Sequence, residues 1–85
     1  MIMYTVYILR TSANTLYIGQ TKNLEKRLQE HTSKKGNASK YLRKFSSFTL
    51  VYTEKYATLS EALKREYFLK QLSKDEKESL ILKTF

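Results

Sequence analysis

The sequence contains no cysteine, no proline and a single histidine, His31, in 85 residues. The absence of cysteine excludes disulfide cross-links and cysteine-ligated zinc, and one histidine excludes a metal site built from several imidazoles. No apolar run approaches the roughly 20 residues of a membrane-spanning helix, and no cationic-then-apolar signal peptide opens the chain. We therefore expect one soluble, cytoplasmic domain (1–85) without membrane contact.

Positive charge is in excess and is unevenly placed. Sixteen Lys and Arg residues against eight Asp and Glu residues give a net charge of +8. Segment 22–44 holds eight of the basic residues and two of the acidic ones, and therefore carries +6 of this charge. A local basic patch on a nearly neutral body is typical of a nucleic-acid-binding protein, although a solvated basic loop gives the same pattern.

The residue pattern predicts an α/β arrangement around three strands, in the order ββα-β-αα. Runs of β-branched and aromatic residues indicate strands at 4–10, 16–21 and 48–56. The expected helices cover 24–31 or slightly beyond after the N-cap Asn23, 59–72 after the capping box Thr58-x-x-Glu61, and 74–82 after the capping box Ser73-x-x-Glu76. The remaining expected segments are a polar turn at 11–14, a basic loop at 33–39 and a short helical turn at 41–45.

One carboxylate stands on the expected buried face of the helix after Thr58. The apolar residues that recur there at helical spacing are Leu59, Ala62, Leu63 and Leu69. Glu66 falls between Ala62 and Leu63 on this face, where a carboxylate is costly unless something pairs with it. Either Lys70, four residues on, forms an ion pair with Glu66, or the carboxylate binds a divalent cation such as Mg²⁺ or Mn²⁺.

The first two strands and the helix after them bring further polar side chains together. Strand alternation places Tyr17 and Gly19 on one face of the second strand, and if the register aligns this face with that of Tyr7, the two tyrosines come close. A glycine inside a strand often marks close approach by a ligand or another backbone. Arg27 and His31 are four residues apart on the helix, so both can point at one location. The alternative is that Tyr7 and Tyr17 are core residues whose hydroxyls are hydrogen-bonded and have no functional role.

These residues together resemble the GIY-YIG nuclease family. The first motif reads Thr5-Val6-Tyr7 in place of Gly-Ile-Tyr, whereas the second, Tyr17-Ile18-Gly19, matches letter for letter. The stretch LYIGQTKNLEKRLQEH is similar to the family's strand, turn and arginine-bearing helix, and EALKREYFLKQLSK to its metal-binding helix. The resemblance spans Tyr4 to about Ile81 and is greatest for small single-domain members, which resemble the nuclease module of bacterial excision repair.

The resemblance implies an α+β fold with a three-stranded antiparallel sheet flanked by helices, and metal-dependent hydrolysis of phosphodiester bonds with one Mg²⁺ or Mn²⁺ ion. Tyr7 and Tyr17 match the two motif tyrosines, one of which acts as general base for the attacking water or positions it. Arg27 matches the arginine that contacts the scissile phosphate. His31 matches a position able to relay or hold a proton. Glu66 matches the carboxylate that ligates the metal.

The basic segment is expected to hold the nucleic-acid backbone without reading bases, with Tyr41 available to stack on a base. The expected DNA-binding residues are Gly19, Gln20, Lys22, Lys34, Lys35, Lys40, Tyr41, Arg43, Lys44 and Lys70. We expect a monomeric endonuclease that acts on DNA in DNA repair, with RNA left open as a substrate.

Two departures from the family pattern support an alternative. Gln20 stands where many members have a lysine, and Lys77 and Glu78 occupy the region where many have an asparagine. These differences favour a nucleic-acid-binding module on the same scaffold with little or no cleavage activity. A third hypothesis is an interaction domain whose basic patch meets an acidic protein.

Overall fold

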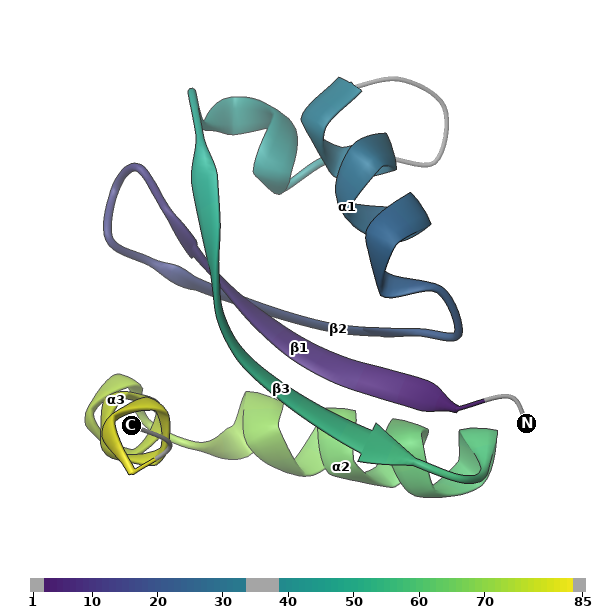
Figure 1. The fold of residues 1–85 in the computed structure, drawn as a ribbon. Helices are drawn as coiled ribbons and strands as arrows, with labels where there is room; N and C mark the ends of the chain where they lie inside the picture. Colours follow the sequence, from purple (N-terminus) through teal and green to yellow (C-terminus); the bar gives the residue numbers. More distant parts are fainter. Residues whose placement is uncertain (1–2, 34–38, 84–85) are drawn as a thin grey trace.

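The computed structural model describes residues 3–33 and 39–83, and its elements follow the expected order (Figure 1). They are β1 (Tyr4–Thr11), β2 (Leu16–Thr21), α1 (Leu24–Ser33), the 3-10 helix η1 (Leu42–Lys44), β3 (Phe48–Tyr56), α2 (Leu59–Gln71) and α3 (Lys74–Leu82). The expected elements are therefore confirmed to within about two residues at each end. Most of the expected basic loop, residues 34–38, lies outside the described residues. Within the described ranges, no helix combines the length and apolar character needed to cross a bilayer.

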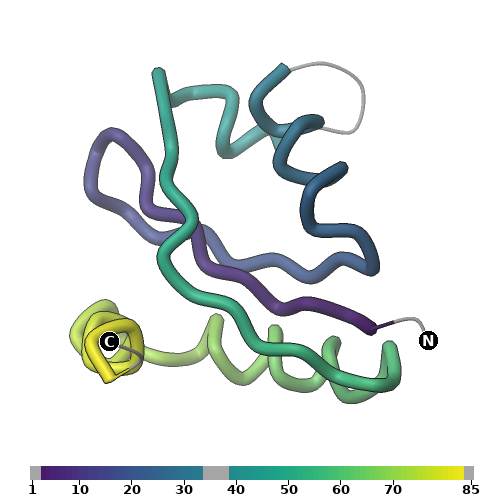
Figure 2. The backbone as a smooth tube through the Cα atoms, viewed as in Figure 1, coloured from purple at the N-terminus to yellow at the C-terminus, as the bar shows by residue number. Residues whose placement is uncertain are grey.

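The three strands form one antiparallel sheet in the order β2-β1-β3, which confirms the expected α+β fold. Helix α1 and η1 cover one face of the sheet, and α2 and α3 cover the other (Figures 1 and 2). The register pairs Tyr7 with Gly19 and Leu9 with Tyr17, so the faces of β1 and β2 that carry the tyrosines are aligned, which is the condition for the two tyrosines to come close.

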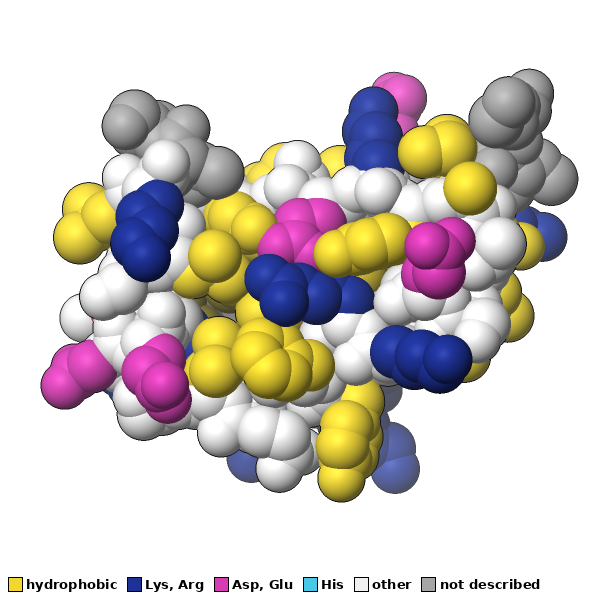
Figure 3. All heavy atoms as spheres, turned by 90° about the horizontal axis from the view of Figure 1, so that it is seen from below, with side chains coloured by type: hydrophobic (Ala, Val, Ile, Leu, Met, Phe, Trp, Pro, Cys, Tyr) yellow, Lys and Arg dark blue, Asp and Glu magenta, His cyan; other side chains and the backbone are white. Residues whose placement is uncertain are grey.

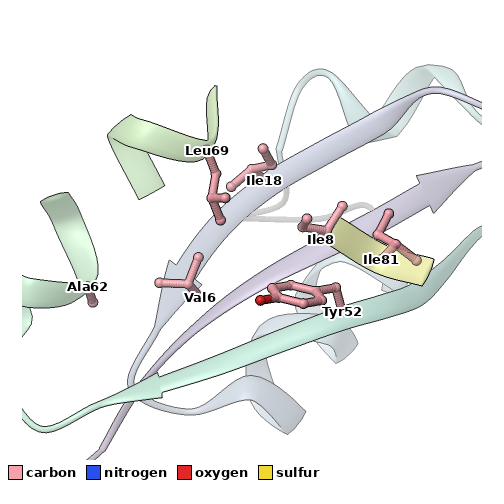
Figure 4. Close-up of a cluster of buried hydrophobic side chains, with 7 residues drawn as sticks. All are labelled: Val6, Ile8, Ile18, Tyr52, Ala62, Leu69 and Ile81. Carbon is pink, nitrogen blue, oxygen red and sulfur yellow. The ribbon is translucent and has the colours of Figure 1, made fainter. Parts of the chain in front are cut away.

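Alternation along β1 divides the core into two clusters, one on each face of the sheet. The cluster beneath α2 and α3 consists of Val6, Ile8, Ile18, Tyr52, Ala62, Leu69 and Ile81 (Figure 4). On the opposite face, Tyr7 and Leu9 pack against Leu42 of η1. Tyr7 is only 1% exposed, so a tyrosine expected to serve the site is also part of the core.

The prediction of the buried face of α2 is partly wrong, because Leu59 and Leu63 are each 44% exposed. Ala62 and Leu69 are fully buried and face the sheet. Leu63 follows Ala62 directly and therefore points about 100° away from it around the helix. Packing of Ala62 and Leu69 into the core cluster turns Leu59 and Leu63 outward, and the ion pair of Arg65 with Glu54 of β3 accompanies this orientation.

This ion pair joins α2 to β3 through a shared carboxylate. Arg65 donates from Nε to Glu54 Oε1 over 2.8 Å and from Nη2 to Glu54 Oε2 over 3.0 Å. The hydroxyls of Tyr52 and Tyr56 donate to the same carboxylate. Burial alone would raise the pKa of Glu54, but these hydrogen bonds hold the pKa below its usual range. The ionised carboxylate therefore links α2 to β3 beside the packed core.

Side-chain caps set where the helices begin. Asn23 Oδ1 accepts a hydrogen bond from the backbone N–H of Lys26 over 3.0 Å, which starts α1 immediately after β2. At α3, Ser73 Oγ accepts from the N–H of Glu76 and the Glu76 carboxylate accepts from the N–H of Ser73, a complete capping box. The caps therefore give α1 and α3 fixed starting points beside the sheet.

Candidate active site

Gly19 allows the Tyr7 hydroxyl to lie directly over the backbone of β2. A Cβ atom at position 19 would come within 2.5 Å of Tyr7 Oη and 2.7 Å of Tyr7 Cζ. Real Cβ atoms essentially never approach other atoms so closely, so any other residue at this position forces the phenol ring to move. The close approach expected at Gly19 is therefore made by a tyrosine side chain.

His31, in the last turn of α1, is 1% exposed and contacts Tyr7 through its imidazole. Its Nε2 lies 3.1 Å from Tyr7 Oη, and its Nδ1 accepts a hydrogen bond from the backbone N–H of Ser39 over 3.3 Å. Because a backbone N–H can only donate, the neutral ring carries its proton on Nε2 and donates it to Tyr7 Oη. Burial, with the nearby charge of Arg27, lowers the pKa of His31 and favours this neutral form.

Arg27 reaches the same tyrosine from one turn earlier in α1. Its guanidinium hydrogen-bonds to Tyr7, and its Nη1 lies 3.1 Å from Glu30 Oε1. Burial alone would lower the pKa of Arg27, but the hydrogen bonds to Glu30 and Tyr7 raise it, so the group stays charged. A half-buried permanent cation with a planar fork of donors is suited to bind phosphate oxygens.

The Tyr7 hydroxyl is strongly perturbed by these surroundings. Burial raises the pKa of Tyr7 to about 12, and nearby Tyr17 acts in the same direction. The hydrogen bond and charge of Arg27 oppose the shift, while the negative charge of Glu66 adds to it. Tyr7 is therefore a neutral phenol at neutral pH, and its proton affinity responds to charges on both α1 and α2.

Tyr17 completes an aromatic cluster around His31. Its ring centroid lies 6.5 Å from that of Tyr7 and 5.7 Å from that of His31, the latter in an edge-on arrangement. On its other side Tyr17 is stacked on Tyr41, with centroids 5.9 Å apart and ring planes 17° from parallel. Phe48 meets His31 edge-on from β3. The structure therefore brings the four expected catalytic side chains, Tyr7, Tyr17, Arg27 and His31, into one cluster.

Glu66 approaches this cluster from α2. Its side chain is 19% exposed, and one carboxylate oxygen lies 3.4 Å from Lys70 Nζ. Both alternatives raised for Glu66 therefore remain, because the ion pair is present but loose. Among residues 3–33 and 39–83, no three His, Asp or Glu side chains gather into a metal site. A single carboxylate nevertheless fits Mg²⁺, which keeps several water ligands and completes its shell with phosphate oxygens.

The expected DNA-binding residues lie at different places around the cluster. Gly19 is buried, and Gln20 alternates onto the face of β2 that α2 covers. The exposed basic side chains on the α1 side are Lys22, Lys40, Arg43 and Lys44. Tyr41 is 37% exposed and Lys70 is exposed beside Glu66. Lys34 and Lys35 lie outside the described residues.

Three contacts at the site were not expected from the sequence. The backbone N–H of Ser39 orients the imidazole, and Phe48 packs against it, but neither residue belongs to a recognisable motif. Lys77 lines a groove with Tyr17 and Tyr41. Its position did carry a signal, because it falls in the region where many family members have an asparagine.

Comparison with known proteins identifies the family. The model of the GIY-YIG catalytic domain matches residues 3–79. The UPF0213 protein OB0043 of Oceanobacillus iheyensis is 47% identical over 76 residues, which cover 89% of this chain and 86% of that protein. The UPF0213 protein YhbQ of Escherichia coli K12 is 43% identical over 76 residues, which cover 89% of this chain and 74% of that protein.

A solved structure supports the same assignment. The solution NMR structure of the UPF0213 protein BH0048 from Bacillus halodurans has a TM-score of 0.61 and 36% sequence identity, covering 94% of this chain and 83% of that one. Sequence and fold therefore agree over nearly the whole chain, and the family is one of nuclease-type domains. The chain belongs to the GIY-YIG family, among its small UPF0213 members.

Proposed function

We propose that the protein is a metal-dependent endonuclease that hydrolyses phosphodiester bonds in DNA and recognises its substrate by backbone and shape. One observation carries the proposal. The two motif tyrosines, Arg27 and His31 form a single cluster over Gly19, and the charge of Glu66 acts on Tyr7 across it. A purely structural cluster has no need of a half-buried cation beside a tyrosine hydroxyl and an adjacent carboxylate.

In this proposal Arg27 binds non-bridging oxygens of the scissile phosphate through its guanidinium fork. Tyr7 Oη, held by the Nε2–H of His31, positions the attacking water and, as the phenolate, takes its proton. The water oxygen bonds to phosphorus while the bond from phosphorus to the leaving oxygen breaks, and that oxygen takes a proton from solvent. His31 keeps its own proton and, through the Nε2–H that it donates to Tyr7 Oη, stabilises the phenolate before the proton is taken.

Glu66 is the residue that would hold the divalent cation, because its carboxylate is accessible at the edge of the cluster. When bound, Mg²⁺ or Mn²⁺ supplies positive charge to the phosphate and the leaving oxygen. Lys70 Nζ, 3.4 Å from this carboxylate, adds positive charge at the same margin of the site.

The contact between Glu66 and Lys70 also favours a second candidate, a nucleic-acid-binding module with little or no cleavage. If the ammonium group occupies the carboxylate permanently, no metal ligand remains at this position. An i,i+4 ion pair on a helix contributes only about 0.3–0.5 kcal/mol. A divalent cation can therefore readily displace the ammonium group from the carboxylate. We therefore favour the nuclease.

The test is a cleavage panel of single-stranded, duplex, flapped and branched DNA, with one RNA substrate, in the presence of Mn²⁺ or Mg²⁺. Wild-type protein should nick at least one DNA structure, whereas Glu66→Gln should lose nicking and keep its binding affinity. Asp75→Asn is the matched control, since it removes one exposed carboxylate from α3 and should cleave like the wild type. Cleavage retained by Glu66→Gln would refute the mechanism, and metal-independent binding without product from any substrate would favour the second candidate.

A further inference from the structure

A solvent-open groove follows the edge of β2 next to the aromatic cluster. Its lining comes from four separate parts of the chain, namely β2, the residue preceding η1, α2 and α3. The lining residues are Leu16, Tyr17, Ile18, Tyr41, Lys70 and Lys77. Tyr17 belongs both to this groove and to the catalytic cluster, so a molecule in the groove lies next to the place where the scissile phosphate is proposed to bind.

One wall of the groove is an anchored aromatic ring. Tyr41 stacks on Tyr17 at 5.9 Å, and its hydroxyl donates to Thr15 Oγ1 over 2.7 Å. Phe45 also packs against this ring, tilted and with centroids 5.2 Å apart, so the ring is held in one orientation while 37% of the residue stays exposed. A nucleobase can stack on a fixed and partly exposed aromatic ring of this kind. Because folding already orders the ring, base binding loses little further side-chain entropy.

The facing wall carries two lysines. Lys70 extends from α2 beside Glu66, and Lys77 is a half-buried residue of α3. No acidic residue is found among the described residues that line the groove. Glu78, the residue next to Lys77, is engaged elsewhere, because Arg10 binds its carboxylate through two hydrogen bonds of 2.6 and 2.7 Å. Glu66 partly neutralises Lys70, so the net positive charge of this wall comes mainly from Lys77.

The position of Lys77 is fixed by the way α3 docks on the sheet. Arg10 of β1 holds Glu78, and Lys74 Nζ donates to the backbone carbonyl of Asn14 over 2.6 Å. Both contacts attach α3 to the β1–β2 hairpin and leave Lys77 facing the groove. The helix is thus placed so that a lysine, rather than an asparagine, stands near the site.

The outward-facing surface of α2 and α3 is less suited to a polyanion than the groove. The outer surface of α2 and α3 shows acidic, basic and hydrophobic side chains mixed together (Figure 3). Glu61, Asp75 and Glu76 are exposed there among exposed lysines, so this surface offers a polyanion no continuous positive charge. The nucleic acid is therefore better accommodated at the edge of β2.

We propose that the groove holds one unpaired nucleotide adjacent to the scissile phosphate, with its base stacked on Tyr41 and its phosphate between Lys70 and Lys77. This inference rests on the proposed nuclease function and specifies its substrate class. A base stacked on a protein ring has left the stack of a duplex, so the preferred substrate carries an unpaired nucleotide next to the cut. Lys77 is a phosphate-binding residue in this account.

The test measures binding by fluorescence anisotropy in EDTA, so that no cleavage is required. The probes are a labelled flapped DNA, a single-stranded oligonucleotide and a blunt duplex. Tyr41→Ala should weaken binding of the flapped and single-stranded probes by about 5- to 150-fold, the range of one base–aromatic stack, and leave the duplex nearly unchanged. Tyr41→Phe keeps the ring and should stay within about twofold of the wild type.

The lysine is tested by salt dependence. Lys77→Gln should lower the slope of log affinity against log salt for single-stranded DNA by about 0.7, the value for one lost phosphate contact. Lys64→Gln is the matched control, because it is exposed on α2 about 120° around the helix from Lys70. Its slope should equal that of the wild type.

The outcomes separate this inference from the proposed function. If Tyr41→Ala weakens all three probes equally, or none of them, the unpaired-nucleotide site is refuted even when the wild type cleaves DNA. If Lys77→Gln and Lys64→Gln change the slope equally, the role of Lys77 is refuted. If the selective losses are found but no metal supports cleavage, the groove stands and the nuclease function fails.

Discussion

Replacement of Gly19 by alanine tests the geometry on which the site depends. The new Cβ would lie 2.5 Å from Tyr7 Oη and 2.7 Å from Tyr7 Cζ, where an ordinary contact needs 3.4–4 Å. The ring must therefore withdraw by about 1 Å, and a displacement of that size at a reacting group costs about 100-fold in rate. Because Tyr7 is buried, overpacking should also lower the free energy of unfolding by about 1–3 kcal/mol.

The assay combines nicking rates with Mn²⁺ and chemical unfolding followed by circular dichroism. A Tyr7→Leu background provides the control, since it removes all three phenol atoms that a Cβ would meet, namely Oη, Cζ and Cε1. Alanine at position 19 should cost much less stability in that background, with a coupling of about 0.5–3 kcal/mol between the two positions. Wild-type rate and stability in Gly19→Ala would refute the argument, as would equal costs in the two backgrounds.

Two further predictions concern titratable groups. Glu54→Gln should lower the free energy of unfolding at pH 7 by about 1–3 kcal/mol, measured by urea unfolding. The pKa of Glu54 is lowered in the folded protein, so its stabilisation is fully present above the unfolded pKa and is lost as pH falls through the folded pKa. The stability of the variant should therefore approach that of the wild type in acid. A constant stability difference at all pH values would contradict this. The pKa of Tyr7 is raised to about 12, so the fraction of phenolate, and with it the cleavage rate, should rise between pH 7 and 9 by up to about tenfold per pH unit. Tyr7→Phe should abolish this dependence of rate on pH. If the dependence is retained in that variant, the general base would be assigned to Tyr17.

Much of the fold could be predicted from short-range signals. Asn23, Ser73 and Glu76 make the caps that their sequence spacing indicates. Alternation places the tyrosines on one face of each strand but leaves the register between Tyr4–Thr11 and Leu16–Thr21 as a condition. The observed register meets this condition, and burial of one face favours it. Local chemistry and strand alternation therefore carried this part of the prediction.

The rotation of α2 could not be predicted in the same way. Leu59 and Leu63 continue an apolar stripe that helical periodicity assigns to the core, yet both are exposed. Ala62 and Leu69 face the sheet and Arg65 on that side pairs with Glu54, and periodicity within one helix contains no information about partners on the sheet. The same holds for Ser39, whose backbone orients His31 from a segment that no motif describes.

The burial of Tyr7 has a practical consequence for anyone who needs an inactive form of the protein. Tyr7 fills the interior and also carries the oxygen to which the proposed mechanism assigns the reaction. A change at Tyr7 disturbs both packing and the proposed chemistry, so a loss of activity in such a variant would be ambiguous. Glu66, at the rim with 19% of its side chain exposed, offers a change whose effect on chemistry can be read separately from its effect on folding. Trapping a bound substrate for structure determination should therefore begin at Glu66.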